Sequence, residues 1–257
     1  MCIREVLSIS NILENLILMF EFWIQTNWYI AFAMSLVTNL IIYFVAAYLI
    51  NLLTEKITRH NRLGKYIDNR PLKRGQKTNE IKYGIFSCAI FSLVSLLARE
   101  LFVGVIPSSI TQLLSEVLVF TLFYETYSYF VHRLLHTKKF RKPHSVHHYS
   151  VRTTPWSAYS VHPIEALLIG MSAPLFMLIF PVHLSVIFSF HILGVVFTLL
   201  IHSNLKLNGD NIFCQLFNRY TESHAAHHSV GNVNFGFINS FWDLCFKTKY
   251  IESKELY

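Results

Sequence analysis

The segment YSYFVHRLLHTKKFRKPHSVHH, residues 127–148, follows a long apolar run and holds five histidines. A second segment, HAAHHSVGNVNFGFINSFWDLCFKT, spans residues 224–248 and adds three more. These eight of the chain's thirteen histidines form three groups, spaced H-x-x-x-H, H-x-x-H-H and H-x-x-H-H: His132 and His136; His144, His147 and His148; and His224, His227 and His228. On an α-helix such spacings point the side chains of a group to one side, so one helix face can offer several nitrogens to one metal ion.

The rest of the chain is strongly apolar. Hydrophobic residues make up 53% of the 257 positions and charged residues only 14%, against about 25% charged residues in soluble domains. This composition predicts one integral membrane domain over residues 1–257 and excludes an ordinary soluble protein. The four cysteines lie far apart and form no C-x-x-C pair, so they indicate neither a disulfide framework nor a thiolate zinc site.

The net charge of +7 is concentrated in one loop. Residues 55–82 hold nine Lys and Arg against three Asp and Glu, which is nearly the whole excess. The positive-inside rule expects such a loop to be a cytoplasmic connection between two membrane spans, where it can also contact anionic lipid head groups. A dedicated partner site is the alternative, and no nucleic-acid partner is expected.

The apolar runs predict an all-α integral membrane bundle of four to five transmembrane helices. A helix of about 20 residues crosses a hydrocarbon core of about 30 Å. The expected membrane segments are residues 28–53, 83–104, 111–133 and a hairpin over 164–202 that is broken at Pro181.

The N-terminal segment, residues 1–27, is expected to be an interfacial amphipathic helix. Its apolar pattern contains Glu14 and Glu21 and no small-residue cleavage site, which argues against a cleaved signal peptide.

Counting membrane crossings from a cytoplasmic basic loop places all three histidine groups on the same side of the bilayer. Residues 132–162 and 202–250 then form a cytosolic helical cap that carries a dimetal site. One misplaced span would have divided the groups between the two sides. The expected location is the endoplasmic reticulum or a bacterial inner membrane, with the active site facing the cytosol.

The ligand types favour two iron ions. Neutral imidazole suits zinc, copper, iron and nickel, and a site with few carboxylates does not suit magnesium or calcium. Eight histidines exceed the four ligands of one tetrahedral zinc, so two ions are expected. Iron with an open coordination position can activate O₂ and, beside a bilayer, direct it at an unactivated C–H bond of a lipid. Zinc competes well for nitrogen ligands and is expected to replace iron in some purified or crystallised protein.

The two histidine segments, with SAYSVHPIEALL at residues 157–168 between them, resemble the fatty acid hydroxylase/sterol desaturase superfamily of membrane non-haem di-iron oxygenases. The resemblance covers about residues 116–250. It implies a four-helix membrane region under a cytosolic cap that holds two irons, with O₂ as co-substrate. Electrons are expected from a separate donor such as cytochrome b5 or a ferredoxin, because no fused cytochrome b5 region is present. Carried over by motif, the resemblance makes metal ligands of all eight grouped histidines.

Members of the superfamily also recruit histidines between these motifs, and the matching residues here are His162 and His202. Each is either a metal ligand or its supporting partner, or else an interfacial histidine with an ordinary hydrogen bond. The chain departs from the family pattern after Trp242, where Phe246-Lys247-Thr248 replaces the common aromatic-Gly-Thr. This departure bears on the local backbone geometry and not on the metal.

Two carboxylates are candidate catalytic residues. Glu125 lies two helical turns deeper than His132, where an unpaired carboxylate is costly. It is expected to accept an N–H from a ligand imidazole, to line the substrate channel, or to pair with another polar group such as Tyr129. Asp243 is expected to play a similar orienting role, or else to cap a helix.

The expected function is O₂-dependent hydroxylation or desaturation of a sterol, fatty acyl or related lipid. A metal transporter is one alternative, but it predicts histidines and carboxylates distributed along a path through the bilayer. A b-type haem electron carrier is another, but it needs only two or four histidines and leaves the adjacent doublets unexplained. The sequence does not name the substrate.

Overall fold

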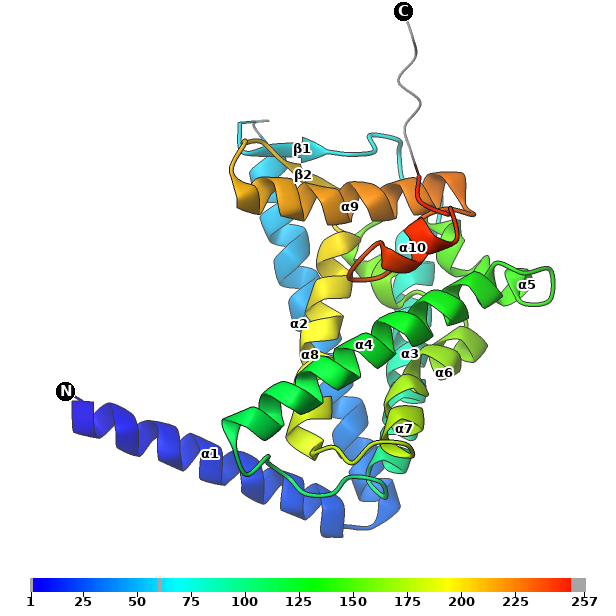
Figure 1. Ribbon diagram of the computed structural model, residues 1–257. Coiled ribbons are helices and arrows are strands. Elements are labelled where there is room, and N and C mark those ends of the chain that lie inside the picture. The colour runs from blue at the N-terminus through cyan, green and yellow to red at the C-terminus, as the bar shows by residue number, and fades with distance from the viewer. Residues whose placement is uncertain (1, 60–61, 251–257) are drawn as a thin grey trace, which may run out of the picture.

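The computed structural model describes residues 2–59 and 62–250. Within them the chain is helical apart from one two-stranded sheet, which confirms the all-α class. Three of the described helices are long and apolar enough to cross a membrane, and they form an upright bundle (Figure 1). These helices are α2 (Trp28–Thr58), α3 (Gln76–Ala98) and α8 (Leu184–Ile201).

The expected third span differs from the prediction. It is a helix, α4 (Ile110–Leu135), but it runs obliquely across the bundle (Figure 1) and is not among those three candidate spans. Two carboxylates, Glu116 and Glu125, are buried along it and lower its mean hydropathy. The predicted count of four to five spans is therefore not confirmed by the described helices.

The first arm of the expected hairpin is also not one helix. It is divided at Met171 into α6 (Pro163–Gly170) and α7 (Ser172–Met177). Pro174 has no N–H with which to continue the hydrogen-bond ladder back to Gly170, and its ring crowds that carbonyl. The second arm, α8, begins after Pro181 as expected.

The expected second span begins and ends earlier than predicted, because α3 starts inside the basic loop and stops at Ala98. Arg99 follows it, and its guanidinium donates to the backbone carbonyls of Ile24 and Thr26. Ile24 lies in the last turn of α1 (Cys2–Gln25) and Thr26 directly follows the helix. This turn lies at the end of the bundle opposite strands β1 (Gly64–Tyr66) and β2 (Leu205–Leu207) and helix α9 (Ile212–Val230) (Figure 1). Arg99 thus ties α3 to that turn.

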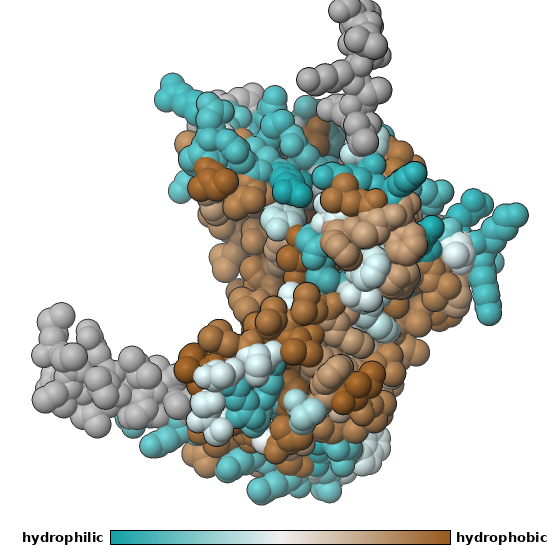
Figure 2. Space-filling model, in the orientation of Figure 1, coloured by the Kyte–Doolittle hydropathy of each residue, from teal (hydrophilic) through white to brown (hydrophobic). Residues whose placement is uncertain are grey.

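A polar cap covers the other end of the bundle. Strands β1 (Gly64–Tyr66) and β2 (Leu205–Leu207) pair antiparallel there, beside the long helix α9 (Ile212–Val230) and the short α10 (Phe241–Cys245) (Figure 1). Figure 2 shows hydrophilic residues gathered over this end and a hydrophobic belt around the middle of the molecule. Hydrophilic residues also lie at the opposite end of the molecule (Figure 2), and this distribution is that of an integral membrane protein.

One short helix anchors the cap to the membrane bundle. The 3-10 helix η2 (Pro155–Tyr159) packs among α2, α3 and α8. Tyr43 of α2 stacks on Tyr159, with ring centroids 5.2 Å apart, and its hydroxyl donates to the Trp156 carbonyl at 2.9 Å. A Cβ at Gly84 of α3 would overlap that hydroxyl, so only glycine lets the two helices close around it. His144, His147 and His148 therefore precede a segment that is tightly packed against the membrane helices.

Candidate metal centre

The grouped histidines come together in two sets of converging nitrogens. In each set one ring nitrogen per histidine lies within 4.8 Å of the others. The first set is His132, His136, His144, His148 and His227, and the second is His147, His202, His224 and His228. All eight motif histidines and His202 are therefore brought together, whereas His162 lies outside both sets.

The adjacent histidine doublets divide between the two sets. His147 belongs to one set and His148 to the other, and His227 and His228 divide in the same way. Neighbouring residues on a helix point about 100° apart, so a doublet can face two separate centres at once. The H-x-x-H-H spacing therefore suits two ions rather than one.

The histidines come from several different elements. His132 lies in the last turn of α4 and His136 is its C-cap residue, whereas His202 is the C-cap residue of α8 and the third motif lies on α9. The second motif is not on one α-helix, although its spacing would fit one. His144 ends the four-residue helix α5 (Arg141–His144), and the doublet lies in a separate 3-10 turn, η1 (His147–Tyr149).

Outward hydrogen bonds hold five of the rings in one tautomer. Each donates its Nδ1–H to an oxygen outside the sets, which leaves Nε2 with a free lone pair pointing inward. The acceptors are the Phe235 carbonyl for His132 (3.1 Å), Asn232 Oδ1 for His136 (3.1 Å), Glu165 Oε1 for His144 (2.9 Å), the Thr198 carbonyl for His202 (2.7 Å) and the Val233 carbonyl for His227 (2.6 Å).

The inward nitrogens fit a bound cation. His136 Nε2 and His144 Nε2 lie 2.9 Å apart, and in the neutral rings the proton is on Nδ1, because each Nδ1 donates to an oxygen outside the sets. Two bare lone pairs at this distance repel unless a cation accepts both. The buried Nε2 atoms of His148 and His227 also have no hydrogen-bond partner among the described residues, and buried nitrogens without a partner are costly. The donor set is almost purely imidazole, which suits iron or zinc.

His136 and His148, two converging histidines outside the membrane helices, are electrically neutral at pH 7. Burial first, and then the neighbouring His144, lowers the pKa of His148 to about 3. The same two causes lower the pKa of His136 to about 4. Metal ions therefore need not displace protons from these rings.

The candidate catalytic carboxylates act on a loop and not on the metal sets. Glu125 accepts the backbone N–H groups of Ile238 and Asn239 at 2.7 and 3.0 Å, so its partners are neither a ligand imidazole nor Tyr129. Asp243 accepts the N–H groups of Phe235 and Gly236 at 2.9 and 2.8 Å. The two carboxylates thereby fix residues 231–240, whose carbonyls hold His132 and His227.

His162 has a local role at the start of α6. It is the N-cap residue, and its Nδ1 accepts the Ile164 N–H at 3.2 Å. The following Pro163 holds it in an extended conformation. Its side chain is thus used in capping.

Two buried carboxylates were not predicted from the sequence. Glu165, 2% exposed, accepts the Nδ1–H of His144. Glu80, 1% exposed, accepts from the Ser150 and Thr154 hydroxyls, which follow the doublet in η1. A lone Glu inside the apolar run PIEALLIG was the available signal for Glu165. Glu80 lies among the charged residues of the basic loop, so its sequence context gave no signal that it is buried.

A large apolar cavity leads to the histidines. Its volume is about 600 Å³, and it extends from Phe20 and Trp23 of α1 to His132, His147 and His202. Aromatic and aliphatic side chains from α3, α4, α7 and α8 form most of its wall. The space is of a size for one lipid.

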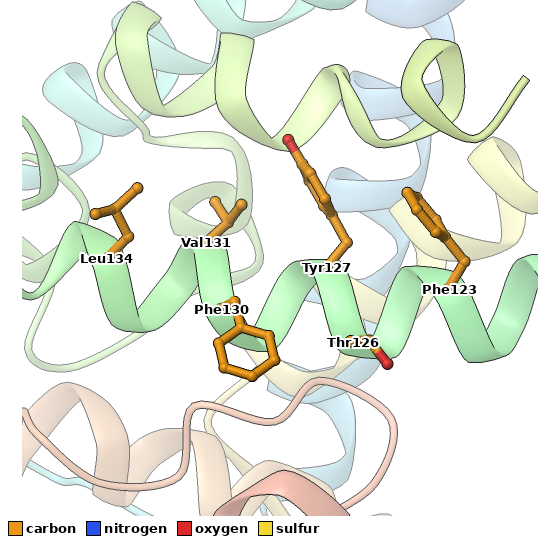
Figure 3. Close-up of a pocket in the computed structure, with 6 residues that line it drawn as sticks. All are labelled: Phe123, Thr126, Tyr127, Phe130, Val131 and Leu134. Atoms are coloured by element: carbon orange, nitrogen blue, oxygen red, sulfur yellow. The ribbon is translucent and has the colours of Figure 1, made fainter. Parts of the chain in front are cut away.

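A second pocket, of about 380 Å³, lies along α4 alone and does not include the histidines. Figure 3 shows Phe123, Tyr127, Val131 and Leu134 on one side of the helix, and Thr126 and Phe130 on the other. Tyr127 donates to the Leu168 carbonyl at 2.6 Å, and Thr126 accepts from Trp242 at 3.2 Å. The hydroxyl groups of this pocket therefore connect α4 to neighbouring segments.

Comparison with known proteins places these features in one class. The family model described as "Fatty acid hydroxylase" matches residues 117–248, half of the chain, and this range contains all nine converging histidines. The protein belongs to the fatty acid hydroxylase family, within the fatty acid hydroxylase/sterol desaturase superfamily.

Several curated relatives are sterol enzymes. The chain is 27% identical over 219 residues to the Delta(7)-sterol 5(6)-desaturase ERG3 of Candida albicans, covering 82% of this chain and 55% of the relative. It is 26% identical over 243 residues to the Delta(7)-sterol 5(6)-desaturase of Candida dubliniensis, covering 92% and 58%. It is 28% identical over 144 residues to the human lathosterol oxidase, covering 54% and 46%. The chain thus spans about half the length of the curated relatives it matches, and no solved structure matches it.

Proposed function

We propose that the protein is an O₂-dependent lipid oxidoreductase, a hydroxylase or desaturase, with two iron ions held by its nine converging histidines. One observation carries the proposal. The apolar cavity ends directly on histidines of both nitrogen sets: His132 of the first set, and His147, His202 and His224 of the second. A hydrocarbon filling that cavity would lie against the metal centre. The names of the relatives, sterol desaturases and a lathosterol oxidase, support lipid oxidation as the reaction class.

The two nitrogen sets divide the metal binding. His132, His136, His144, His148 and His227 would hold one ion, and His147, His202, His224 and His228 would hold the other. When bound there, iron supplies the binding and redox chemistry of O₂.

The chain's own residues orient the histidine rings and exclude water from the centre. The outward Nδ1 hydrogen bonds of five rings aim the Nε2 atom of each ring at the centre. Phe235 and Phe237, from the loop that Glu125 and Asp243 fix, line the cavity beside the histidines. An apolar wall at this point excludes water and holds a C–H bond in place.

The arrangement is less suitable for the two alternatives. A transporter needs ligands along a path, yet nine histidines gather at one end of the bundle. A haem carrier needs room for a porphyrin between two facing imidazoles, whereas here four or five imidazole nitrogens converge within 4.8 Å.

The membrane placement follows from the charge of the cap. We place the cap in the cytosol, in the endoplasmic reticulum or a bacterial inner membrane, because the basic loop that contributes β1 lies at this end. Exposed basic groups there suit a separate acidic electron donor such as cytochrome b5 or a ferredoxin.

Metal analysis combined with lipid mass spectrometry tests the proposal. The purified protein should contain about two irons per chain and show no Soret band. Cells that express it should contain a lipid that has gained one oxygen atom or lost two hydrogen atoms. A Soret band, or lipids unchanged from those of cells carrying an inactive His147→Ala variant, would contradict the proposal.

A further inference from the structure

We infer that a polar cluster in the middle of the membrane bundle binds the hydroxyl group of an uncharged lipid, at a point far from the metal centre. The inference rests on the proposed function, because the lipid held there would be the one whose hydrocarbon reaches the histidines. The cluster lies on the wall of the same cavity.

The cluster joins the three candidate membrane helices. His191 of α8 donates through Nε2 to Asn39 Oδ1 of α2 at 2.7 Å. The Asn39 amide donates to Ser92 Oγ of α3 at 3.0 Å, and Ser95 Oγ of α3 lies 2.9 Å from Ser35 Oγ of α2. Polar side chains in apolar membrane helices are costly unless they are paired or used.

Two groups of this wall keep unused hydrogen-bonding capacity. With Nε2 donating to Asn39, the Nδ1 of His191 is an acceptor, and it forms no hydrogen bond with the side chains and backbone that the structure describes. The Thr38 hydroxyl, beside Asn39 on α2, likewise forms no hydrogen bond with the described residues. His191 and Thr38 both line the cavity. An acceptor and a donor together complement an alcohol, which donates and accepts one hydrogen bond each.

The charge of the cavity limits the ligand to a neutral group. No lysine or arginine is among its described lining residues, and the one carboxylate, Glu165, is bound to His144. The nearby Arg99 donates to the backbone carbonyls of Ile24 and Thr26. A carboxylate or phosphate at the cluster would be buried without a counter-ion, which is strongly unfavourable. A hydroxyl carries no such penalty.

The position of the cluster predicts which carbon reacts. His191 precedes His202 by eleven residues of α8, or roughly 16 Å at 1.5 Å per residue. A lipid with its hydroxyl at the cluster therefore presents to the metal centre a carbon roughly 16 Å away. Apolar lining residues such as Val195 and Phe197 lie between the two points. The oxidised position should be remote from the hydroxyl and not adjacent to it.

Binding measurements on the full chain test the hydroxyl site. The probes are cholesterol, cholesterol methyl ether, palmityl alcohol and palmitate, added to the purified protein in nanodiscs without electron donor. The wild-type protein should bind cholesterol about tenfold more tightly than the ether, and palmityl alcohol more tightly than palmitate. Equal binding of alcohol and ether, or tightest binding of palmitate, would overturn the inference.

Two variants link that preference to the cluster. His191→Phe keeps a ring against Phe91 but removes the acceptor, and should bring the tenfold preference close to one. Thr38→Val keeps the side-chain shape, removes only the hydroxyl and serves if His191→Phe does not fold. Ser115→Ala, on the exposed face of α4, is the matched control and should keep the preference. An unchanged preference in both cluster variants refutes the assignment.

The outcome is separable from the oxygenase proposal because binding needs neither O₂ nor electrons. Tighter binding of the alcohol than of its ether, without any lipid oxidation, would contradict the proposed function but would still support the hydroxyl-binding site. Lipid oxidation with a product oxidised next to its hydroxyl would contradict the site and leave the oxygenase standing. Tandem mass spectrometry of the product locates the oxidised carbon.

Discussion

At the scale of single residues, His202 and His162 are a matched pair for testing the metal ligands. Both are histidines between the motifs, but His202 joins a nitrogen set and His162 caps α6. His202→Ala should reduce bound iron by about one ion per chain, because it removes one of four ligands of its set. His162→Asn keeps a good N-cap residue and should keep the full metal content.

Elemental analysis of the two purified variants decides between the roles. Equal metal loss in both would show that His162 also contributes to the centre. Full metal content in His202→Ala would remove His202 from the ligand set.

Lys247 occupies a backbone conformation that favours glycine. Its φ is 55°, in the left-handed region, at the position where the family pattern commonly has Gly. The strain costs roughly 1–2 kcal/mol for a side chain with a Cβ, part of which the flexibility of glycine in the unfolded chain offsets. Lys247→Gly should stabilise the protein by about 1 kcal/mol and raise the thermal unfolding midpoint by roughly 2 °C or more.

The control is Lys249→Gly, because Lys249 is also exposed but is not among the described residues with positive φ. It should leave the midpoint unchanged or lower it. A lower midpoint in Lys247→Gly would mean that the lysine side chain contributes contacts outweighing the strain.

At the scale of elements, Glu125 connects α4 to the loop 231–240. Glu125→Gln replaces one accepting oxygen by an NH₂ group that cannot accept the N–H of Ile238 or Asn239. The loop should open more often, and the iron affinity should fall about tenfold, because the loop carbonyls orient His132 and His227. Hydrogen exchange of the loop amides measures the opening.

Glu116→Gln is the control on the same helix. Glu116 is also buried, but it accepts from His183 at the other end of α4. This variant should leave exchange in residues 231–240 unchanged. Faster exchange in both variants would point to a general weakening of α4 and not to a specific anchor.

Sequence periodicity predicted the long apolar helices and the motif histidines, but not how the cap is built. The spacing of His144, His147 and His148 fits one α-helix, yet tertiary packing places them on a short helix and a 3-10 turn. The oblique path of α4 was likewise hidden, because span prediction counts apolar length and not helix direction. Glu80 became visible only when the chain brought its partners Ser150 and Thr154 beside it.

At the scale of the whole molecule, the metal centre joins elements that are distant in the sequence. Its nine histidines come from α4, α5, η1, α8 and α9. The membrane helices α2 and α3 contribute none of them and are held by apolar packing around Tyr43. The proposed metal centre therefore predicts a bundle that is stable by burial and a cap whose stability depends on bound metal.

Metal removal tests this division. Binding at free metal a thousandfold above Kd contributes about 4 kcal/mol to the folded state, and without metal the inward lone pairs of His136 and His144 repel. Chelated protein should therefore unfold at a lower temperature, with faster hydrogen exchange in η1 and α9 but not in α2 and α3. Treatment with metal-saturated chelator is the control, and added iron should restore the midpoint. Uniform loosening of bundle and cap would mean that the metal stabilises the whole fold and that the two parts are not independent.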